Sequence, residues 1–437
     1  MKAQTKFKQT EIGMIPEDWE VVDLGVLGNF RNGINFNRND FGNGYPVVNV
    51  KNLFRGRFST IDELDEVKEG TIKNIEAYSL REGDILFARS SVKHAGAGQV
   101  AMVNQLPSKH TLFSGFIIRF RIQDIKRLNN NFLNYLLRSS IYREYLTRIA
   151  TGTTITNLSQ ENLSQIPIIL PNLQEQIAIT KILSDLDSKI EINQEMNKTL
   201  EKIGQALFKF WFIDFEFPNE KGKPYRSSGG KMVDSEIGEI PKGWTEGRLG
   251  DICDITMGQS PPGSTYNESG DGMCFYQGIT DFGFRLPSKR VFCTAPTRFA
   301  EEGDVLLSVR APVGALNVAE ERCAVGRGVA SVRLKGKHNG FLYYLLLATK
   351  SRWETFEAEG TVFGAANKTD VHDFKIVIPP KPLIEKFASI VEPMDVAIRN
   401  SEKESRTLTG LRDSLLPRLM SGRIRVNNIG KSLEVSS

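Results

Sequence analysis

The 437-residue chain has no apolar run of the roughly 18 residues that a membrane span needs, and its polar N-terminus lacks the apolar stretch of a signal peptide. We therefore expect a cytoplasmic protein. Cysteine is also scarce, and no two cysteines form a Cys-x-x-Cys pair. The four cysteines, Cys253, Cys274, Cys293 and Cys323, all fall in the second half of the chain. This spacing favours isolated reduced thiols over a zinc site.

An excess of charge of one sign is lacking as well. The formal net charge is only +4, and 25% of the residues are charged. Bulk charge therefore does not indicate a nucleic-acid-binding protein, although a basic face can form where charges are segregated. Histidine is rare and scattered, which favours surface or core positions over a ligand or general-base role for His94, His110, His338 and His372.

Motifs of catalysis are missing too. The sequence contains no Asn-Pro-Pro-Tyr/Phe motif of an adenine methyltransferase and no phosphate-cradling Gly-x-x-x-x-Gly-Lys-Ser/Thr loop. It also lacks the His-Glu-x-x-His and Gly-x-Ser-x-Gly motifs of metalloproteases and serine hydrolases. We therefore predict a chain that is not an enzyme, with no catalytic residue, no metal site and no cofactor of its own.

What the sequence does contain is an internal repeat. Glu11-Ile12-Gly13-Met14-Ile15-Pro16-Glu17-Asp18-Trp19 returns 225 residues later as Glu236-Ile237-Gly238-Glu239-Ile240-Pro241-Lys242-Gly243-Trp244. Each copy is followed by a long amphipathic helix. A unit of about half the chain is longer than a solenoid repeat, whose period reaches roughly 50 residues. The chain is a duplicated module, and two like modules suggest a target with two like halves.

The predicted organisation follows from this repeat. It comprises a module over residues 1–170, a long helix over 171–215, a Pro-, Gly- and Ser-containing linker over 216–235, a second module over 236–380, a second long helix over 381–422 and a polar tail over 423–437. The modules are predicted to be α/β (α+β). Strand-like runs lie at 47–50, 84–88, 116–120 and 304–309, and buried helices are predicted at 132–137 and 341–346.

The two long helices carry matching seams with the 4-3 spacing of a coiled coil, and the second seam lies 208 residues after the first. We predict that the helices pair antiparallel. The predicted seam comprises Ile179, Leu183, Leu186, Ile190, Asn193, Asn197, Leu200 and Leu207 with Phe387, Val391, Met394, Ile398, Ser401, Ser405, Leu408 and Leu415.

Both seams turn polar at their middle. In an antiparallel pair Asn193 and Asn197 face Ser401 and Ser405, and such a layer fixes the register at some cost in stability. The alternative is that the helices bend apart at this point, so that the four side chains are solvated.

Further repeated motifs carry a family resemblance. Gly-Asp precedes a strand-like run in residues 82–90 and 302–310, an Ile-rich segment precedes each long helix at 166–171 and 376–380, and Glu175-Gln176-Ile177-Ala178 opens the first helix. With the repeated opening segment, they resemble the specificity (S) subunit of type I restriction-modification enzymes over nearly the whole chain. The second helix departs from this pattern, because Lys386 replaces the glutamine.

The resemblance implies two target recognition domains, each reading one half of an asymmetric bipartite DNA site, and paired helices that set the spacing between the halves. It implies partner methylase (M) and restriction (R) subunits, two of each, which use S-adenosylmethionine, ATP and Mg²⁺ for adenine methylation and DNA cleavage. Independently, a helix of roughly 40 residues spans about 60 Å. This length suffices to hold two domains one DNA turn, about 34 Å, apart.

Base edges in the major groove are read by Arg, Lys, Asn, Gln, Ser and Thr. We expect such residues on loops that follow module strands, and an ordinary solvated loop is the alternative for each. The first-module candidates for DNA binding are Arg31, Asn35, Arg38, Lys51, Asn52, Arg55, Arg57, Arg89, Ser90, Ser91, Lys93, His94, Thr153 and Thr154. The second-module candidates are Gln259, Ser260, Tyr266, Gln277, Thr280, Ser308, Arg310 and Thr361. Gly83, Asp84, Gly303 and Asp304 fit turns instead.

Aromatic residues crowd the end of the first long helix. Phe208, Phe210, Trp211 and Phe212 are candidates for docking a methylase subunit, and core packing is the alternative. Two rival functions are also considered for the whole chain. One is the specificity subunit of a fused restriction-methylation system of the type IIG kind, and the other is a protein–protein adaptor that does not bind DNA.

Overall fold

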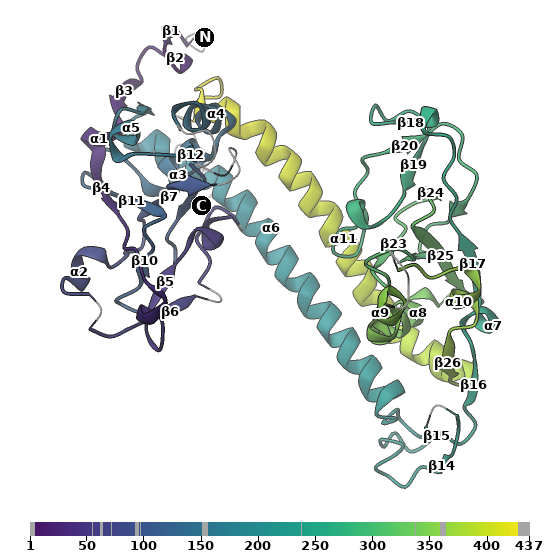
Figure 1. The fold of residues 1–437 in the computed structure, drawn as a ribbon. Helices are drawn as coiled ribbons and strands as arrows, with labels where there is room; N and C mark the ends of the chain where they lie inside the picture. The colour runs from purple at the N-terminus through teal and green to yellow at the C-terminus, as the bar shows by residue number, and fades with distance from the viewer. Residues whose placement is uncertain are drawn as a thin grey trace, which may run out of the picture. The chain divides into compact units, whose positions relative to one another are not determined.

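A computed structural model describes residues 5–54, 56–61, 64–70, 72–91, 96, 98–150, 156–236, 238–336, 338–358 and 364–426. The chain divides into two compact units (Figure 1). Unit 1 combines the described residues up to 188 with those from 408 onward, and unit 2 covers those from 189 to 407. The long helices α6 (Leu173–Phe208) and α11 (Lys381–Met420) contribute to both units. Within the described part of the chain, no helix is long and apolar enough to cross a membrane.

The central sheet of each unit has the same four-stranded antiparallel order, β4-β11-β7-β9 in unit 1 and β17-β25-β22-β23 in unit 2. The strands are β4 (Gly28–Asn32), β7 (Ile85–Ala88), β9 (Val100–Met102), β11 (Ile117–Ile122), β17 (Cys253–Met257), β22 (Val305–Ser308), β23 (Leu316–Val318) and β25 (Val329–Leu334). Strands β7 and β22 are buried along their whole length, which fits their mostly apolar sequences.

A second sheet adjoins each central sheet, and here the units differ. Unit 1 has the order β10-β5-β6 and unit 2 the order β18-β20-β19-β24-β21, with one parallel pair in common, β5 with β10 and β19 with β24. The strands are β5 (Gly44–Val48), β6 (Asp65–Lys68), β10 (Leu112–Phe113), β18 (Tyr266–Asn267), β19 (Met273–Tyr276), β20 (Phe292–Cys293), β21 (Phe299–Ala300) and β24 (Cys323–Val325). The modules therefore share the central sheet and one parallel strand pair, whereas the rest of the second sheet differs.

Short strand pairs join the start of each module to its end. After each opening tryptophan, β3 (Glu20–Asp23) pairs with β13 (Pro167–Leu170) and β16 (Thr245–Arg248) pairs with β26 (Lys375–Ile378). The remaining pairs are β1 (Phe7–Thr10) with β2 (Gly13–Pro16), β8 (Ser90–Ser91) with β12 (Thr156–Asn157), and β14 (Met232–Val233) with β15 (Ile240–Pro241).

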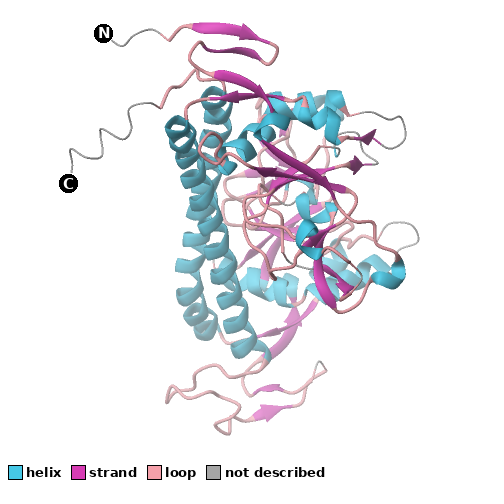
Figure 2. Cartoon of the chain, turned by 90° about the vertical axis from the view of Figure 1, so that its left-hand side faces the viewer, coloured by secondary structure: helices cyan, strands magenta, loops and turns pink. Residues whose placement is uncertain are grey.

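Helices are mixed with strands in both modules, which confirms the predicted α/β (α+β) class (Figure 2). The predicted buried helices are α3 (Asn130–Arg138) and α8 (Asn339–Ala348). The short helices are α1 (Leu24–Leu27), α2 (Ile75–Tyr78), α4 (Ser140–Ile149), α5 (Gln160–Ser164), α7 (Leu249–Ile252), α9 (Lys350–Ala358) and α10 (Lys368–His372), with 3-10 turns η1 (Arg38–Asp40), η2 (Val50–Leu53), η5 (Gly263–Thr265) and η6 (Ile279–Asp281).

The predicted turns before β7 and β22 are confirmed. Gly83 and Gly303 adopt φ of 85° and 84°, in the left-handed region that glycine favours. The aspartate that follows each glycine accepts from an arginine on the neighbouring strand, 2.7 Å from Asp84 to Arg121 and 2.5 Å from Asp304 to Arg333. These aspartates anchor the central sheets.

The long helices pair antiparallel in both units. In unit 1, Asp187 of α6 meets Arg412 at 2.8 Å, and Glu175, earlier on α6, meets Arg425 beyond the end of α11 at 2.7 Å. In unit 2, Asn193 Nδ2 of α6 lies 2.8 Å from Glu404 Oε2 of α11. Phe208, later on α6, packs against Phe387, earlier on α11, with ring centroids 5.7 Å apart. All sixteen predicted seam residues are buried or half-buried.

The polar layer forms inside the helix pair of unit 2. Asn193 is fully buried and donates to Glu404, and its amide also lies 3.3 Å from the Ser405 hydroxyl. Asn197 and Ser401 are 3% and 5% exposed. The solvated alternative is therefore wrong. The amide oxygens of Asn193 and Asn197 find no hydrogen-bond partner among the described residues.

A residue that follows the end of each long helix packs on an opening tryptophan. In unit 2, Phe217 stacks on Trp244 with ring centroids 5.3 Å apart. In unit 1, the residue 208 positions later, Arg425, lies 5.8 Å from the Trp19 ring. Residues at both ends of the predicted linker, Phe217 and Val233, therefore pack on the core of unit 2, and within the predicted polar tail Ile424 and Val426 pack on the core of unit 1.

Candidate nucleic-acid interface

Four loops of module 2 enclose a pocket of about 380 Å³. Its walls come from the ends of β17 and β19, the segment after β22 and the turn between β24 and β25. The lining residues are Ser260, Pro261, Gly263, Tyr266, Gln277, Arg310, Arg327 and Gly328. The structure thus brings together four of the eight second-module candidates.

Backbone hydrogen bonds fix these loops. Gly326 N donates to Tyr276 O at 2.9 Å, and Val309 N donates to Gly328 O at 3.0 Å. Position 328 requires glycine, because a Cβ atom there would lie only 2.2 Å from the backbone oxygen of Gln277. The pocket is therefore a property of the sheet frame and its turns.

The side chains around this pocket offer hydrogen-bond donors. Arg310 and Arg327 are exposed, and neither guanidinium bonds to another described residue. Ser260 Oγ accepts from Arg327 N at 3.3 Å, and the Tyr266 hydroxyl donates to Pro261 O at 2.6 Å. Two available guanidinium groups beside an exposed glutamine suit the edges of bases or phosphate oxygens.

Arg327 was not among the sequence candidates. Its signal is the tripeptide Gly326-Arg327-Gly328 between two apolar runs. Glycine on both sides permits a tight turn that presents the side chain between them.

The same loop frame recurs in module 1. The equivalent bonds run from Ser114 N to Val48 O at 3.0 Å and from Arg89 N to Phe116 O at 2.8 Å. This register pairs Asn35 with Ser260, Asn49 with Gln277, Ser90 with Arg310 and Gly115 with Arg327. None of the four positions keeps its residue, so the two modules present different side chains on one frame.

Several first-module candidates lie around this equivalent place. Asn35 is exposed, and its side-chain oxygen lies 1.9 Å from where a Cβ atom on Gly115 would stand. Ser90 Oγ donates to Asn157 Oδ1 at 2.7 Å, and Arg89 Nη1 donates to Gly115 O at 3.4 Å. Where module 2 has Arg310 and Arg327, module 1 therefore has the hydroxyl of Ser90 and a glycine, Gly115, beside the amide of Asn35.

Other candidates lie away from these positions. Arg31 lines a separate pocket of about 550 Å³ and stands 5.0 Å from the ring of Tyr78. Burial lowers the pKa of Arg119, which lines the same pocket, to about 10. Lys51 pairs with Asp65 at 3.3 Å. Arg38, Gln259 and Thr280 are exposed.

The structure assigns three candidates to the interior. Asn52 is 3% exposed and its amide oxygen accepts from Asn49 N at 2.9 Å. Ser308 is 1% exposed, with its hydroxyl 2.7 Å from Arg310 O. The Arg57 side chain is 12% exposed and faces Asp187. We therefore assign all three to loop support rather than DNA contact.

Some candidates cannot be placed. Arg55, Lys93, His94, Thr153, Thr154 and Thr361 lie outside the described residues, as does the side chain of Ser91.

The aromatic cluster at the end of α6 is mostly core. Phe208, Trp211 and Phe212 are at most 8% exposed and pack with Phe341, Phe387 and Trp244, so the packing alternative holds for these three. Phe210 is 43% exposed, on the turn Lys209–Ile213 that continues α6.

Groups suited to metal chemistry are not gathered within the described ranges. No three His, Cys, Asp or Glu side chains there could hold a metal ion. The four cysteines are separate buried thiols, and burial raises the pKa of Cys253 and of Cys323 to about 12.

Comparison with known proteins gives a consistent result. The model of the type I restriction modification DNA specificity domain matches residues 16–202 and 241–409. The chain is 33% identical over 430 residues to a Methanocaldococcus jannaschii protein named as the specificity subunit of the type I restriction enzyme MjaX, covering 97% of each chain. It is 28% identical to the MjaIX specificity subunit of the same organism, covering 98% of each. The fold is similar to the crystal structure of a type I restriction-modification S subunit from M. genitalium, with a TM-score of 0.60, 17% identity and coverage of 96% of this chain and 98% of that one.

Proposed function

Because this chain belongs to the type I restriction-modification DNA specificity family, as a specificity subunit, we propose that its two modules read the two halves of an asymmetric bipartite site in double-stranded DNA. Module 2 reads through the pocket of Gln277, Arg310 and Arg327, and module 1 through the equivalent place around Asn35 and Ser90.

One observation carries this proposal. Equivalent backbone hydrogen bonds hold the loop frame in both modules, whereas the side chains at its equivalent positions differ. With the same loop arrangement, both modules can bind the same kind of ligand, and their different side chains change which bases each module reads. Guanidinium groups suit guanine, and asparagine suits adenine. The half-sites are therefore expected to differ.

Catalysis belongs to the partner subunits in this proposal. The chain binds DNA, while methylase subunits methylate adenine with S-adenosylmethionine and restriction subunits cleave DNA with ATP and Mg²⁺. Two subunits of each kind complete the complex. This is supported by family membership and by the missing catalytic motifs of the sequence.

A stripe on α6 and on the turn Lys209–Ile213 that continues it supports the docking of one methylase subunit. Ile192, Met196, Ile203, Phe210 and Ile213 are each at least 40% exposed. With the smaller exposed residues Thr199 and Ala206 they keep strict 4-3 spacing, which is the pattern of a seam for a partner helix. Of the positions 208 residues later, only Leu411 is an exposed large apolar residue.

This docking role predicts that Ile203→Ser with Phe210→Ser abolishes co-purification with the methylase subunit, because an interface loses its central apolar contacts. Both side chains are exposed, so the melting temperature of the free chain should hold. Lys202→Ser, an exposed neighbour, is the control. Co-purification of the double variant at the level of the control would exclude the stripe as the docking site.

Salt dependence tests the DNA role itself. Phosphate contacts release counterions, so the affinity for target DNA should fall at least about tenfold between roughly 50 and 200 mM salt. The titration uses the assembled complex, with assembly checked at each salt concentration. A flat affinity, together with partner capture that needs no DNA, would favour the protein–protein adaptor instead.

A further inference from the structure

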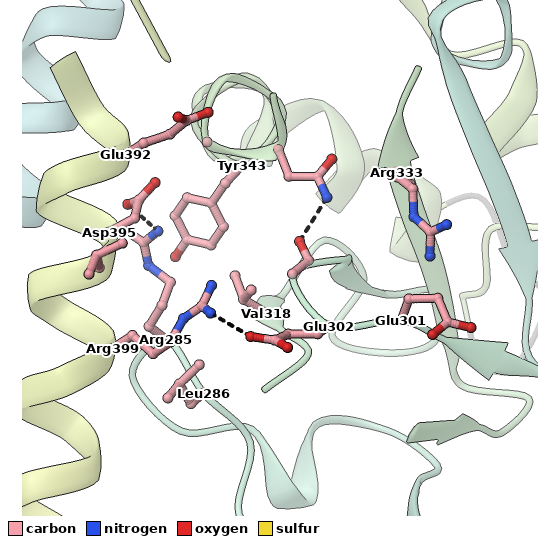
Figure 3. A pocket seen from close by; sticks show the side chains of 14 residues that line it. Arg285, Leu286, Glu301, Glu302, Val318, Arg333, Tyr343, Glu392, Asp395 and Arg399 are labelled. Carbon is pink, nitrogen blue, oxygen red and sulfur yellow. Dashed lines mark hydrogen bonds and ion pairs between the residues drawn. The ribbon is translucent and has the colours of Figure 1, made fainter. Parts of the chain in front are cut away.

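The loop that follows β19 in module 2, which begins at Gln277 of the pocket, is here called its recognition loop, and the segment that follows β5 is the recognition loop of module 1. The side chain of Arg285 extends from the loop of module 2 to both long helices of the same unit. The side chain of Arg285 is only 4% exposed, and its Nη1 lies 2.8 Å from Asp395 Oδ1 on α11. Its Nη2 lies 3.6 Å from Glu201 Oε2 on α6. The guanidinium stands 3.7 Å from the centre of the Tyr343 ring (Figure 3). One side chain thus joins the loop to both long helices and to α8.

Module 1 has the same device in unit 1. Arg57 lies 3.5 Å from Asp187 Oδ2 on α6 and donates to the hydroxyl of Tyr135 on α3. Asp187 also accepts from Arg412 of α11 at 2.8 Å. The loop of module 1 is therefore also joined to both long helices.

The two devices are equivalent by position and by backbone bonding. Asp395 lies 208 residues after Asp187, the spacing of the helix repeat, and Arg285 lies 228 after Arg57, the offset that pairs Val48 with Tyr276. Met102 N donates to Arg57 O at 3.0 Å and Val318 N donates to Arg285 O at 2.8 Å. The arginine, unlike the residues around the pocket, is kept in both copies.

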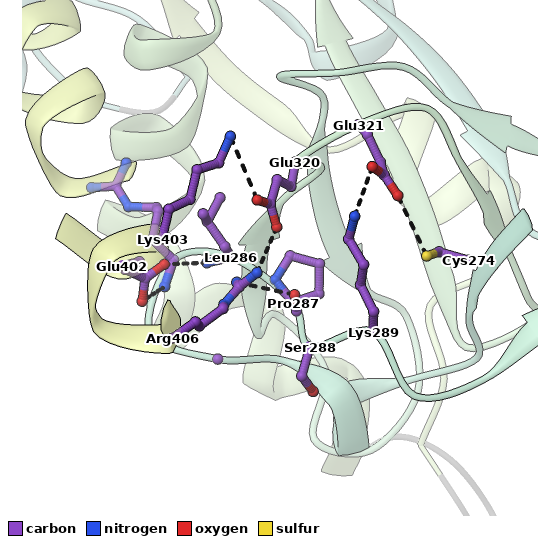
Figure 4. Close-up of polar contacts among 12 residues, drawn as sticks. Cys274, Leu286, Pro287, Ser288, Lys289, Glu320, Glu321, Glu402, Lys403 and Arg406 are labelled. Atoms are coloured by element: carbon purple, nitrogen blue, oxygen red, sulfur yellow. Dashed lines mark hydrogen bonds and ion pairs between the residues drawn. The ribbon is translucent and has the colours of Figure 1, made fainter. Parts of the chain in front are cut away.

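Each arginine stands eight residues after a residue at the recognition position, Gln277 in module 2 and Asn49 in module 1. The loop of module 2 is clamped further. Glu402 of α11 accepts from Leu286 N at 2.8 Å, and Arg406 donates to Pro287 O at 3.2 Å and pairs with Glu320 at 2.6 Å (Figure 4). The part of the recognition loop that contains Leu286 and Pro287 is therefore fixed on α11.

We propose that Arg57 and Arg285 are positioning residues for DNA readout, each fixing the recognition loop of its own module against the long helices without touching DNA. This inference rests on the proposed function. A guanidinium holds two carboxylates and an aromatic face in one geometry, which a lysine ammonium does not. Loosening this contact spreads the loop over several positions, so base contacts weaken while phosphate contacts and folding persist.

The test uses the complete chain in its complex and a target identified by DNA selection. Arg310→Ala first identifies the half-site of module 2, because it removes a side chain of that pocket. Arg285→Lys should then lower discrimination against substitutions in that half-site by roughly tenfold, about the worth of one base-pair contact. Discrimination in the other half-site should stay at the wild-type value. The slope of log affinity against log salt concentration should also stay unchanged. Arg57→Lys should give the reciprocal result.

Arg322→Lys is the matched control, since Arg322 makes an exposed ion pair with Glu301 at 3.2 Å in the same module. Should Arg285→Lys fail to fold, Tyr344→Phe removes only a hydroxyl 3.3 Å from Arg285 and should produce a smaller loss in the same half-site. Wild-type discrimination in folded variants, or equal losses in both half-sites, would overturn the positioning role alone. A wild-type complex that selects no sequence would overturn the proposed function, and the positioning role with it.

Discussion

Arg57 of module 1 and Arg310 of module 2 both lie on loops. Arg310 is exposed beside a polar pocket, whereas the side chain of Arg57 is only 12% exposed and faces Asp187. At the scale of single residues, the surroundings of a guanidinium decide its role. An arginine without an internal partner is available to DNA, whereas one paired inside the fold holds a loop in place.

Removal of an exposed arginine should therefore affect binding and leave folding intact. We expect Arg310→Ala to lower the affinity for target DNA by about 1–3 kcal/mol and to relax selectivity in one half-site. The control is Arg322→Ala, which removes an exposed, ion-paired arginine of the same module. Equal losses from the two variants, measured by DNA titration, would contradict a reading role for Arg310.

Glu201 gives a prediction for pH. Burial raises the pKa of this carboxyl group, against the lowering effect of Arg285, and Asp395 nearby raises it further. A raised pKa means that the folded chain binds more protons than the unfolded chain, so this group costs stability as pH rises through the raised pKa. We expect Glu201→Gln to gain in melting temperature relative to wild type as the pH rises above the ordinary glutamate pKa of about 4.3. A melting difference that is constant or falls with pH would contradict this.

At the residue scale, the sequence could place candidate side chains on loops but could not show which of them are buried. Polar residues near predicted loops could be chosen from the sequence, and the structure places four of them, Ser260, Tyr266, Gln277 and Arg310, around one pocket. Burial depends on the packing of distant segments. No local pattern indicates that Arg57 meets a helix 130 residues later, and Asn52, with its amide turned inward, looks like any loop asparagine.

At the scale of elements, the long helices depend on a seam that is apolar at both ends and polar at its centre. Asn197 is 3% exposed, and its amide oxygen has no hydrogen-bond partner among the described residues. A buried polar group without a partner costs free energy, and its persistence is consistent with a role in fixing the register.

We expect Asn197→Leu to raise the free energy of unfolding by about 1 kcal/mol or more, because it replaces an unsatisfied buried amide with an apolar side chain. Gln194→Leu, an exposed amide on the same helix, should change stability by less than about 0.5 kcal/mol. Thermal melts of both variants check the prediction. A lower melting temperature for Asn197→Leu alone would mean that the polar layer stabilises the pair.

The helices themselves could be predicted because a heptad repeat is a local signal that runs over many residues. The role of the aromatic cluster could not be predicted in this way. Phe208, Trp211 and Phe212 face Phe341 and Phe387, residues more than 100 positions away, whereas the exposed stripe through Ile203 and Phe210 follows the 4-3 spacing of the helix. Periodicity therefore locates a seam without showing what covers it.

At the scale of the whole molecule, the chain is one frame built twice. The central sheets share strand order, the loops share backbone bonds, and each recognition loop carries an arginine that meets an aspartate of α6 or α11. The loop positions that face the pockets carry different side chains in the two modules. A kept frame with changed contact residues is the arrangement expected of a protein that reads two different short sequences.

The most direct test of this account is the selection of random duplex DNA by the intact chain in complex with its methylase subunit. The account predicts two short motifs of different sequence, separated by a gap of constant length, in nearly all recovered molecules. A single uninterrupted motif, two identical motifs or no enriched sequence would contradict it.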